Sequence, residues 1–249
     1  METVSPWYYL GYIIPHLYTD VDAYQFYRIA PEGMVLVTAQ LNLRDRTLPA
    51  VEDELPTLRD RIDLLGRLGR VDRIAISGVP LAAALGRKRT LALLEEAGDR
   101  TGLPCDTDIE AHIRALKHLG ASRIALAAKW SDAFNESVIS YLNEAGIEVV
   151  AARGWGSSLE QTKTSNAAED HLRALEVGRK LLSEAPAAQA LMIAGGLWFA
   201  VHAVPILEAE FDKPVTLNIT ATIWAALHAA GGSLRGRPEP RWGKLLGGL

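Results

Sequence analysis

Cysteine is almost missing from this chain of 249 residues, which contains only Cys105. A single thiol cannot form a disulfide within the chain, and it cannot build the multi-cysteine sites that bind zinc or iron–sulfur clusters. Such sparse use of cysteine is typical of proteins in a reducing compartment. We therefore expect a cytoplasmic protein.

An excess of basic residues and a long apolar run are also missing. The chain has 26 Lys and Arg against 30 Asp and Glu, a net charge of −4, so no basic stripe can follow the phosphates of a nucleic acid. The basic residues near the C-terminus are interpreted as a solvated tail; they are Arg235, Arg237, Arg241 and Lys244. No apolar run approaches the roughly 18 residues of a membrane span, and the first nine residues lack the basic region of a secretory signal. We expect a soluble protein with neither a nucleic-acid nor a membrane partner.

Short apolar runs alternate with segments of helical spacing along almost the whole chain. The predicted strands are 10–15, 34–41, 73–77, a short strand ending at Cys105, 123–128, 148–152, 190–194 and 215–217. The predicted helices are 55–68, 80–98, 108–118, 132–145, 167–184, 201–211 and 221–229. Strands separated by helices favour parallel βαβ units, so the predicted class is α/β.

An internal repeat relates segment 73–121 to segment 190–232. Each contains an apolar strand that ends on glycine, then a helix, a short strand after a proline, a polar turn and a second helix. The repeat predicts two pseudo-symmetric, flavodoxin-like parallel-sheet halves, 1–112 plus 218–249 and 113–217. The carboxyl ends of both sheets would then open onto one cleft, where α/β proteins usually bind ligands.

The motifs TGLPC at 101–105 and RALKHLGASRIALAAKWSDAFNESVISYLNEAGIEV at 114–149, with GKLL at 243–246, resemble the aspartate/glutamate racemase superfamily. The branch most similar is that of arylmalonate decarboxylases and maleate cis–trans isomerases. The resemblance implies an enzyme without a cofactor that acts on the carbon next to a carboxylate. It also implies a nest of backbone N–H groups for that carboxylate, and thiols that serve as acid, base or nucleophile.

The sequence departs from this pattern at both thiol positions. The first half has Gly78 and Val79 followed by Pro80, and the second-half position falls within segment 194–196, AGG. Cys105 replaces neither thiol and is interpreted as structural. Two-thiol racemisation is therefore excluded, and the usual one-thiol mechanism is missing too.

The strand ends supply the candidate site residues. Gly195 and Gly196 are expected to hold a carboxylate at a helix N-terminus, whereas Gly78 and Val79 are weaker binders because Pro80 has no N–H. Lys129, directly after a buried strand, is a candidate anion holder, base or Schiff-base lysine, and it is equally compatible with an outward-pointing lysine.

Two histidines and several loop residues complete the set of candidates. His16 and His202 follow a strand end and the double glycine, and either could transfer a proton near neutral pH, although a structural role is the commoner one. Ser157 and Ser158 are candidate carboxylate donors, and Trp130 and Trp198 suggest an aromatic or bulky substrate wall. The acidic run 106–112 is interpreted as a helix cap, so no metal site is expected.

Two classes of function remain open. The first is a cofactor-independent lyase, decarboxylase-like or otherwise carbon–carbon cleaving, or an isomerase, acting on a small acid, either aromatic or aliphatic. The alternative is a hydrolase on the same scaffold or a non-catalytic protein that binds a small acid. Substrate identity and oligomeric state, a homo-oligomer included, are not determined by the sequence.

Overall fold

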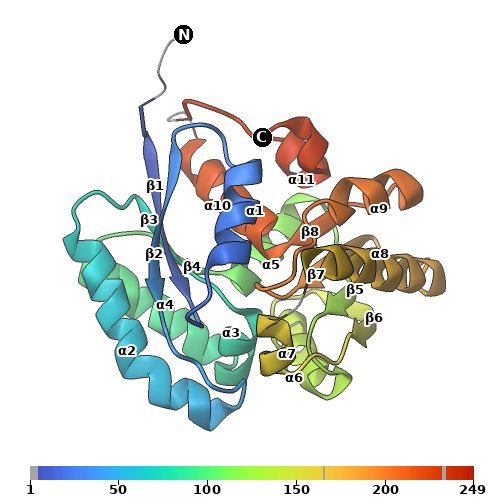
Figure 1. The fold of residues 1–249 in the computed structure, drawn as a ribbon, viewed down its shortest axis with the longest axis horizontal. Coiled ribbons are helices and arrows are strands. Elements are labelled where there is room, and N and C mark those ends of the chain that lie inside the picture. The colour runs from blue at the N-terminus through green and yellow to red at the C-terminus, as the bar shows by residue number, and fades with distance from the viewer. Residues whose placement is uncertain (1–4, 165, 232–233) are drawn as a thin grey trace.

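The computed structural model describes residues 5–164, 166–231 and 234–249. Its strands form two four-stranded parallel sheets, with the orders β2-β1-β3-β4 and β6-β5-β7-β8 (Figure 1). The strands are β1 (Tyr8–Ile14), β2 (Met34–Gln40), β3 (Arg73–Ile76), β4 (Cys105–Thr107), β5 (Arg123–Ala128), β6 (Glu148–Gly154), β7 (Ala190–Ala194) and β8 (Val215–Leu217). The identical strand order in the two halves confirms the α/β class and the paired parallel sheets predicted from the sequence.

Helices flank both sheets. They are α1 (Asp20–Ile29), α2 (Leu48–Arg67), α3 (Val79–Leu85), α4 (Arg87–Thr101), α5 (Asp108–His118), α6 (Asp132–Glu144), α7 (Leu159–Lys163), α8 (Ala167–Glu184), α9 (Ala203–Phe211), α10 (Asn218–Ala230), the 3-10 helix η2 (Pro240–Trp242) and α11 (Lys244–Gly247). Within the described part of the chain, every helix is too short or too polar to cross a lipid bilayer.

The central strands are apolar throughout because helices cover both of their faces. β7 is buried along its whole length, and β5 is buried except for Arg123 at its start. Apolar side chains of α5 at Ile109 and Ile113 pack in one cluster with Ile124 and Leu126 of β5. Although α5 follows β4 in the chain, it therefore contributes to the core of the other sheet.

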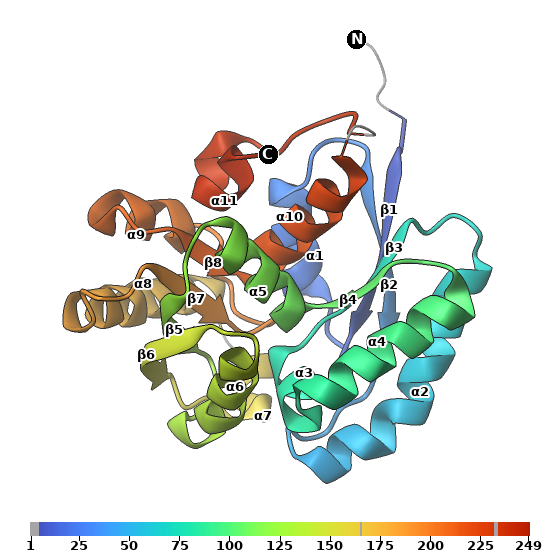
Figure 2. The ribbon, with the colours of Figure 1, turned by 180° about the vertical axis from the view of Figure 1, so that it is seen from behind.

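Helices α5 and α10 lie side by side between the two sheets (Figure 2). They occupy equivalent places, since α5 directly follows β4 and α10 directly follows β8. Their N-termini consequently meet near the carboxyl ends of both sheets, and the residues at these N-termini contact each other across the interface between the halves.

Some boundaries differ from the sequence-based prediction. The expected helix 80–98 is two helices, because Gly86 adopts φ +79° between α3 and α4. Helix α1 lies where a loop was expected, and α9 begins at Ala203, so the segment after the double glycine is not yet helical. Cys105 begins β4, whereas the sequence pattern placed it at a strand's end.

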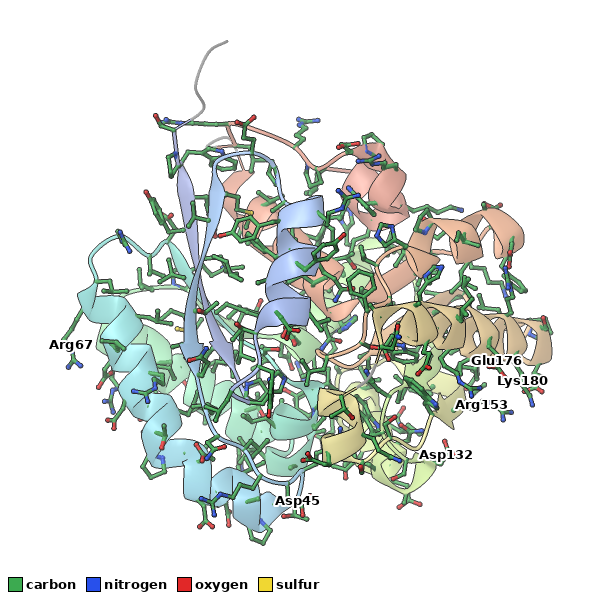
Figure 3. The ribbon with its side chains drawn as sticks, in the orientation of Figure 1. Asp45, Arg67, Asp132, Arg153, Glu176 and Lys180 are labelled. Atoms are coloured by element: carbon green, nitrogen blue, oxygen red, sulfur yellow. The ribbon has the colours of Figure 1, made fainter. Side chains whose placement is uncertain are left out.

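One glycine holds β6 against the loop after β5. A Cβ atom on Gly154 would lie 2.2 Å from the carbonyl oxygen of Trp130 and 2.9 Å from the amide nitrogen of Asp132. The backbone N–H of Gly154 donates to the carboxylate of Asp132 at 2.5 Å. Figure 3 labels Asp132 at the start of α6. The close backbone approach leaves no room for a side chain.

We expect Gly154→Ala to lower the free energy of unfolding by about 3 kcal/mol, because relieving the clash requires the two backbones to separate. Gly98→Ala is the matched control. It lies inside α4, where a Cβ atom would meet only the Leu103 carbonyl at 3.7 Å, and should stabilise the protein by roughly 0.5–1 kcal/mol. Urea denaturation measures both changes. Equal stability of the two variants would contradict the close approach.

Candidate active site

The candidate site is a narrow cavity of about 50 Å³ between the two halves, at the carboxyl ends of their strands. We call it the cleft cavity. Its lining residues are Pro15, His16, Leu43, Arg46, Ser77, Gly78, Pro80, Leu81, Lys129, Trp130, Thr162, Gly195, Gly196 and Leu197. Six of them were site candidates from the sequence: His16, Gly78, Lys129, Trp130, Gly195 and Gly196. The lining is mostly apolar with a few polar groups, as is usual for small-molecule sites.

Arg46 brings a permanent positive charge to the cavity from the loop after β2. Its guanidinium donates to the carbonyl oxygen of Ser157 at 3.2 Å and to Oγ1 of Thr162 at 3.5 Å, so it spans from one half to the other. Burial lowers the pKa of Arg46, and neighbouring Asp45 opposes this shift. Figure 3 labels Asp45 on this loop. Because arginine stays protonated in proteins, the cavity holds a cation that fits a carboxylate.

Arg46 was not among the sequence candidates. It follows the edge strand β2, whose counterpart in the other sheet is β6, whereas Lys129 follows β5, the counterpart of β1. The rule that selected Lys129, a charge following an apolar strand, would have reached Arg46 had the loop 41–47 been read as part of the strand end. Five residues lie between Gln40, the last residue of β2, and Arg46, so the sequence pattern did not connect Arg46 with the strand end.

Lys129 lines the cavity, but its ammonium is turned to partners within the protein. It pairs with the Asp170 carboxylate at 2.8 and 3.0 Å and donates to the carbonyl oxygen of Leu197. Burial lowers the pKa of Lys129, and the hydrogen bond that Lys129 donates to Asp170 opposes this shift. The side chain is 1% exposed. This geometry makes Lys129 a residue that fixes the glycine loop, since Leu197 directly follows Gly195 and Gly196.

The glycine loop also differs from the expected helix N-terminus. The N–H of Gly195 donates to Oδ1 of Asn218 at 3.4 Å. Further along, the N–H of Phe199 donates to Asp170 and that of Val201 to Oε1 of Gln25. The amides after the double glycine are thus bound by buried side chains. The helix predicted over 201–211 begins at Ala203, and those side chains hold the segment between the double glycine and this helix in a non-helical path.

The remaining candidates lie outside the cavity lining. The ring of His202 lies among the rings of His171, Phe199 and Trp242. Trp198 is fully buried and donates from Nε1 to the carbonyl oxygen of Asp170 at 2.8 Å. Neither side chain is among those that form the cavity wall.

The two serines and Val79 also have local contacts. Ser157 offers its carbonyl oxygen to Arg46, and Ser158 caps α7 by accepting from the N–H of Gln161. Val79 is fully buried in an apolar cluster of α3, α5 and β5. Ser157 contacts the cavity wall through Arg46 and Ser158 contacts it through Thr162, but neither serine is itself a lining residue.

The acidic run after β4 forms a helix cap. Oγ1 of Thr107 accepts from the N–H of Glu110, as predicted for a cap. Asp106 pairs with Arg114, and Glu110 pairs with Arg87 at 2.9 Å. Across residues 5–164, 166–231 and 234–249, no group of three or more His, Cys, Asp or Glu side chains is placed to hold a metal ion.

A buried polar network joins the two halves behind the cavity. Its centre is a pair of equivalent residues: Asp108 begins α5 and Asn218 begins α10, and Nδ2 of Asn218 donates to Oδ2 of Asp108 at 3.0 Å. Each also accepts from the strand-end glycine of its own half. Gly78 donates to Asp108 at 2.9 Å, and Gly195 donates to Asn218.

His112 belongs to the same network, one turn after Asp108. Its Nε2 lies 3.0 Å from Oδ1 of Asn218 and its Nδ1 lies 2.9 Å from Oγ1 of Thr216. Since the amide oxygen can only accept, Nε2 carries the proton and the threonine hydroxyl donates to Nδ1. Burial lowers the pKa of His112 to about 4. The imidazole is therefore neutral at physiological pH.

Comparisons with known proteins identify the family of this chain. The family model described as arylmalonate decarboxylase matches residues 24–242. The chain belongs to the arylmalonate decarboxylase family. A curated relative, the arylmalonate decarboxylase of Bordetella bronchiseptica, is 27% identical over 177 residues, 70% of each chain. The resemblance seen in the sequence is thereby confirmed.

Solved structures share the fold over nearly the whole chain. A crystal structure of arylmalonate decarboxylase has a TM-score of 0.77 at 22% identity and covers 97% of this chain and 100% of the other. The maleate isomerase Iso from Pseudomonas putida S16 has a TM-score of 0.84 at 22% identity, with 97% and 98% covered. A maleate cis–trans isomerase variant from Nocardia farcinica gives 0.78 at 18% identity, with 96% and 98% covered.

We expect Lys129→Met to lower the free energy of unfolding by about 3–5 kcal/mol, because it leaves the Asp170 charge buried and unpaired. Adding Asp170→Leu should restore most of the loss. The control is Arg123→Met at the other end of β5, which breaks the exposed pair with Glu148 and should cost at most about 1 kcal/mol. Urea denaturation distinguishes them. Equal losses from Lys129→Met and Arg123→Met would refute the buried pair.

His112 should make stability depend on pH in a defined window. Its pKa falls from the ordinary 6.5 to about 4 on folding, so between these values the unfolded chain binds more protons. Stability from this residue is therefore full above pH 6.5 and is lost as the pH falls toward 4, by about 3 kcal/mol in total.

The measurement is the difference in unfolding free energy between wild type and His112→Gln from pH 4 to pH 7. Buried acids titrate in both proteins, so the difference isolates the histidine. His118→Gln, at an exposed position of the same helix, serves as control. A difference for His112→Gln that stays constant with pH would show that the imidazole is not buried in neutral form.

Proposed function

We propose that the protein is a cofactor-independent lyase, decarboxylase-like or otherwise carbon–carbon cleaving, or an isomerase, acting on the carbon next to a carboxylate of a small acid without a thiol. The observation that carries the proposal is the composition of the cleft cavity. It combines a cation, Arg46, with a histidine, His16, and a bare backbone at Gly195 and Gly196, at the shared carboxyl ends of both sheets.

Arg46 supports an acidic substrate. A guanidinium presents two parallel N–H groups that match the two oxygens of a carboxylate. Its present partners, the carbonyl of Ser157 and the hydroxyl of Thr162, are neutral, so its charge is available to an entering anion. The glycines opposite allow a carboxylate to approach the backbone closely, which a side chain would prevent.

Decarboxylation fits the site better than racemisation. The bond from the α carbon to the departing carboxylate breaks, carbon dioxide leaves, and the electron pair stays on the α carbon until one proton is added there. A single proton donor is sufficient, whereas racemisation needs groups on both faces of that carbon. Trp130 on the cavity wall favours an acid with an aromatic or bulky group.

The relatives support the same class. Their names identify an arylmalonate decarboxylase and maleate isomerases, all of which act on dicarboxylic acids. Cys105 lies in β4 with its Sγ 3.4 Å from the Leu103 carbonyl oxygen, and burial raises its pKa. It is absent from the cavity lining. The proposed chemistry therefore uses no thiol.

The pairing of Lys129 with groups inside the protein favours a second candidate function, a non-catalytic protein that binds a small acid. Three contacts from its ammonium go to Asp170 and Leu197, so it is poorly placed to act as a base or to form a Schiff base. If no other group transfers a proton, the cavity would hold an acid without converting it.

The test is an assay with phenylmalonate, followed by release of carbon dioxide, and with maleate, followed by formation of fumarate. Turnover by wild type and by Cys105→Ser at similar rates is expected. Arg46→Met should lower kcat/KM about tenfold to a hundredfold, because the charge-assisted contact to the substrate is lost. Arg44→Met, an exposed residue of the same loop, is the control and should match wild type.

Calorimetric titration with malonate separates the alternatives. Binding that depends on Arg46 without turnover of either acid would support the non-catalytic protein. Absence of both binding and turnover would overturn an acid-binding role for the cavity. A hundredfold loss in Cys105→Ser, with the fold intact, would overturn the thiol-free mechanism.

A further inference from the structure

The carboxyl group of Asp22 lies behind the wall of the cleft cavity. Asp22, in the first turn of α1, is 1% exposed. Its Oδ2 atom is buried, and among the described residues none forms a hydrogen bond with it. A buried carboxylate without donors is strongly disfavoured, because nothing replaces the water that it has lost. Such a group either keeps its proton or meets a ligand.

Asp22 faces the cavity wall at Gly196. The position that a Cβ atom of Gly196 would occupy lies 3.6 and 3.7 Å from the two carboxyl oxygens of Asp22 and 3.4 Å from Oγ of Ser77. Both Gly196 and Ser77 line the cavity. Because Gly196 has no side chain, no atom of a side chain at position 196 stands between the carboxyl group of Asp22 and this part of the cavity wall.

A neighbouring acid takes the negative charge that Asp22 avoids. Asp108 accepts from the N–H of Gly78 at 2.9 Å, from Oγ of Ser77 at 3.1 Å and from Oγ1 of Thr222 at 2.9 Å. Asn218 and Tyr12 donate to it as well. Burial raises the pKa of Asp108, and these donors oppose that shift because they stabilise the anion. Of two nearby carboxyl groups, the one with hydrogen-bond donors ionises more readily, and the other keeps its proton.

The surroundings of Asp22 hold the proton there. Burial, then the charge of Asp108 from α5 and that of Asp20 on its own helix, raise its pKa well above the ordinary value. Tyr12 of β1 also faces this pair, and its own pKa is raised by burial and by both acids. None of these groups is a cation.

We propose that Asp22 is a catalytic residue: a neutral carboxylic acid that gives its proton to the substrate carbon across the bare Cα of Gly196. The proposal rests on the function proposed above. When the carbon–carboxylate bond breaks and carbon dioxide leaves, the electron pair on the α carbon takes the proton of Asp22. Asp22 becomes a carboxylate and regains a proton from solvent before the next turnover. Placing the acid behind a glycine keeps it desolvated until a substrate fills the cavity.

The first experiment measures the protonation state without any substrate. An infrared difference spectrum between wild type and Asp22→Asn at neutral pH should contain the carbonyl stretch of one protonated carboxylic acid in wild type. Asp20→Asn, an exposed residue of the same helix turn, should show no such band. Absence of the band in the Asp22 difference would overturn the proposal whatever the activity is.

The second experiment measures turnover of phenylmalonate. Asp22→Asn keeps the shape but cannot donate a carboxylic proton, so kcat should fall at least about a hundredfold, within the range of general acid catalysis. Malonate binding should change less than about threefold, and Asp99→Asn, at an exposed position of α4 outside the cavity lining, should match wild type in both. Gly196→Ala, whose methyl group would fill the space between Asp22 and the cavity, should also lower kcat.

The outcomes separate the two proposals. Wild-type turnover that Asp22→Asn retains, with loss only in His16→Asn, would overturn the role of Asp22 and leave the proposed function standing. No turnover by wild type on any acid would overturn both proton transfer and the proposed function. If Asp22→Asn fails to fold, the protonated-acid band is sought instead against Asp22→Leu, and Gly196→Ala carries the kinetic test.

Discussion

The contact between Asp108 and Asn218 joins the two halves at the points where the chain leaves each sheet. Each residue begins a helix directly after the last strand of its sheet, and each binds the amide of the glycine that follows the third strand. The mutual bond therefore sets the distance between Gly78 and Gly195, the two strand ends that face each other across the cavity. A pair of this kind, fully buried and with its donors satisfied, fixes one arrangement of the halves.

The crossing contacts of this pair are also symmetric. One turn into each helix, a side chain reaches to the other half: Thr222 of α10 donates to Asp108, and His112 of α5 donates to Asn218. The asymmetry lies in the chemistry of the central residues. An acid stands in one half and an amide in the other, so the central pair contains one ionisable carboxyl group instead of two. Burial in the first place, and then the charge of this acid, raise the pKa of nearby Asp22.

The cavity combines a held cation with buried acids. Lys129 follows the central strand β5 and Arg46 follows the edge strand β2, but of the two, within the described residues, only Lys129 is paired with a carboxylate. Lys129 bonds to Asp170 of α8 and to the Leu197 carbonyl oxygen, and so links the loop of Gly195 and Gly196 to α8. The two cations therefore differ in role, because one is neutralised within the protein and the other bonds to neutral groups.

The sequence alone determined the class of fold and the location of the cleft. Strands 123–128, 190–194 and 215–217 were predicted with the boundaries that the structure has, because fully apolar runs between helical segments are unambiguous in a parallel sheet. The repeat predicted two equal sheets, and glycines at the ends of apolar strands led to the cavity wall. These signals depend on residues that are close in the sequence, so they can be recognised without the structure.

Only the tertiary structure decided which side chains face the cavity and which carry charge. Lys129 was expected to open toward a substrate, but Asp170, 41 residues away in the chain, neutralises it. Asp108 was interpreted as part of a helix cap, and Asp22 was not among the candidates from the sequence. The two residues lie 86 positions apart in the chain, and the charge of Asp108 raises the pKa of Asp22 only in the folded protein. Burial and pairing arise between segments distant in the chain, and no local pattern encodes the pKa or the orientation that results.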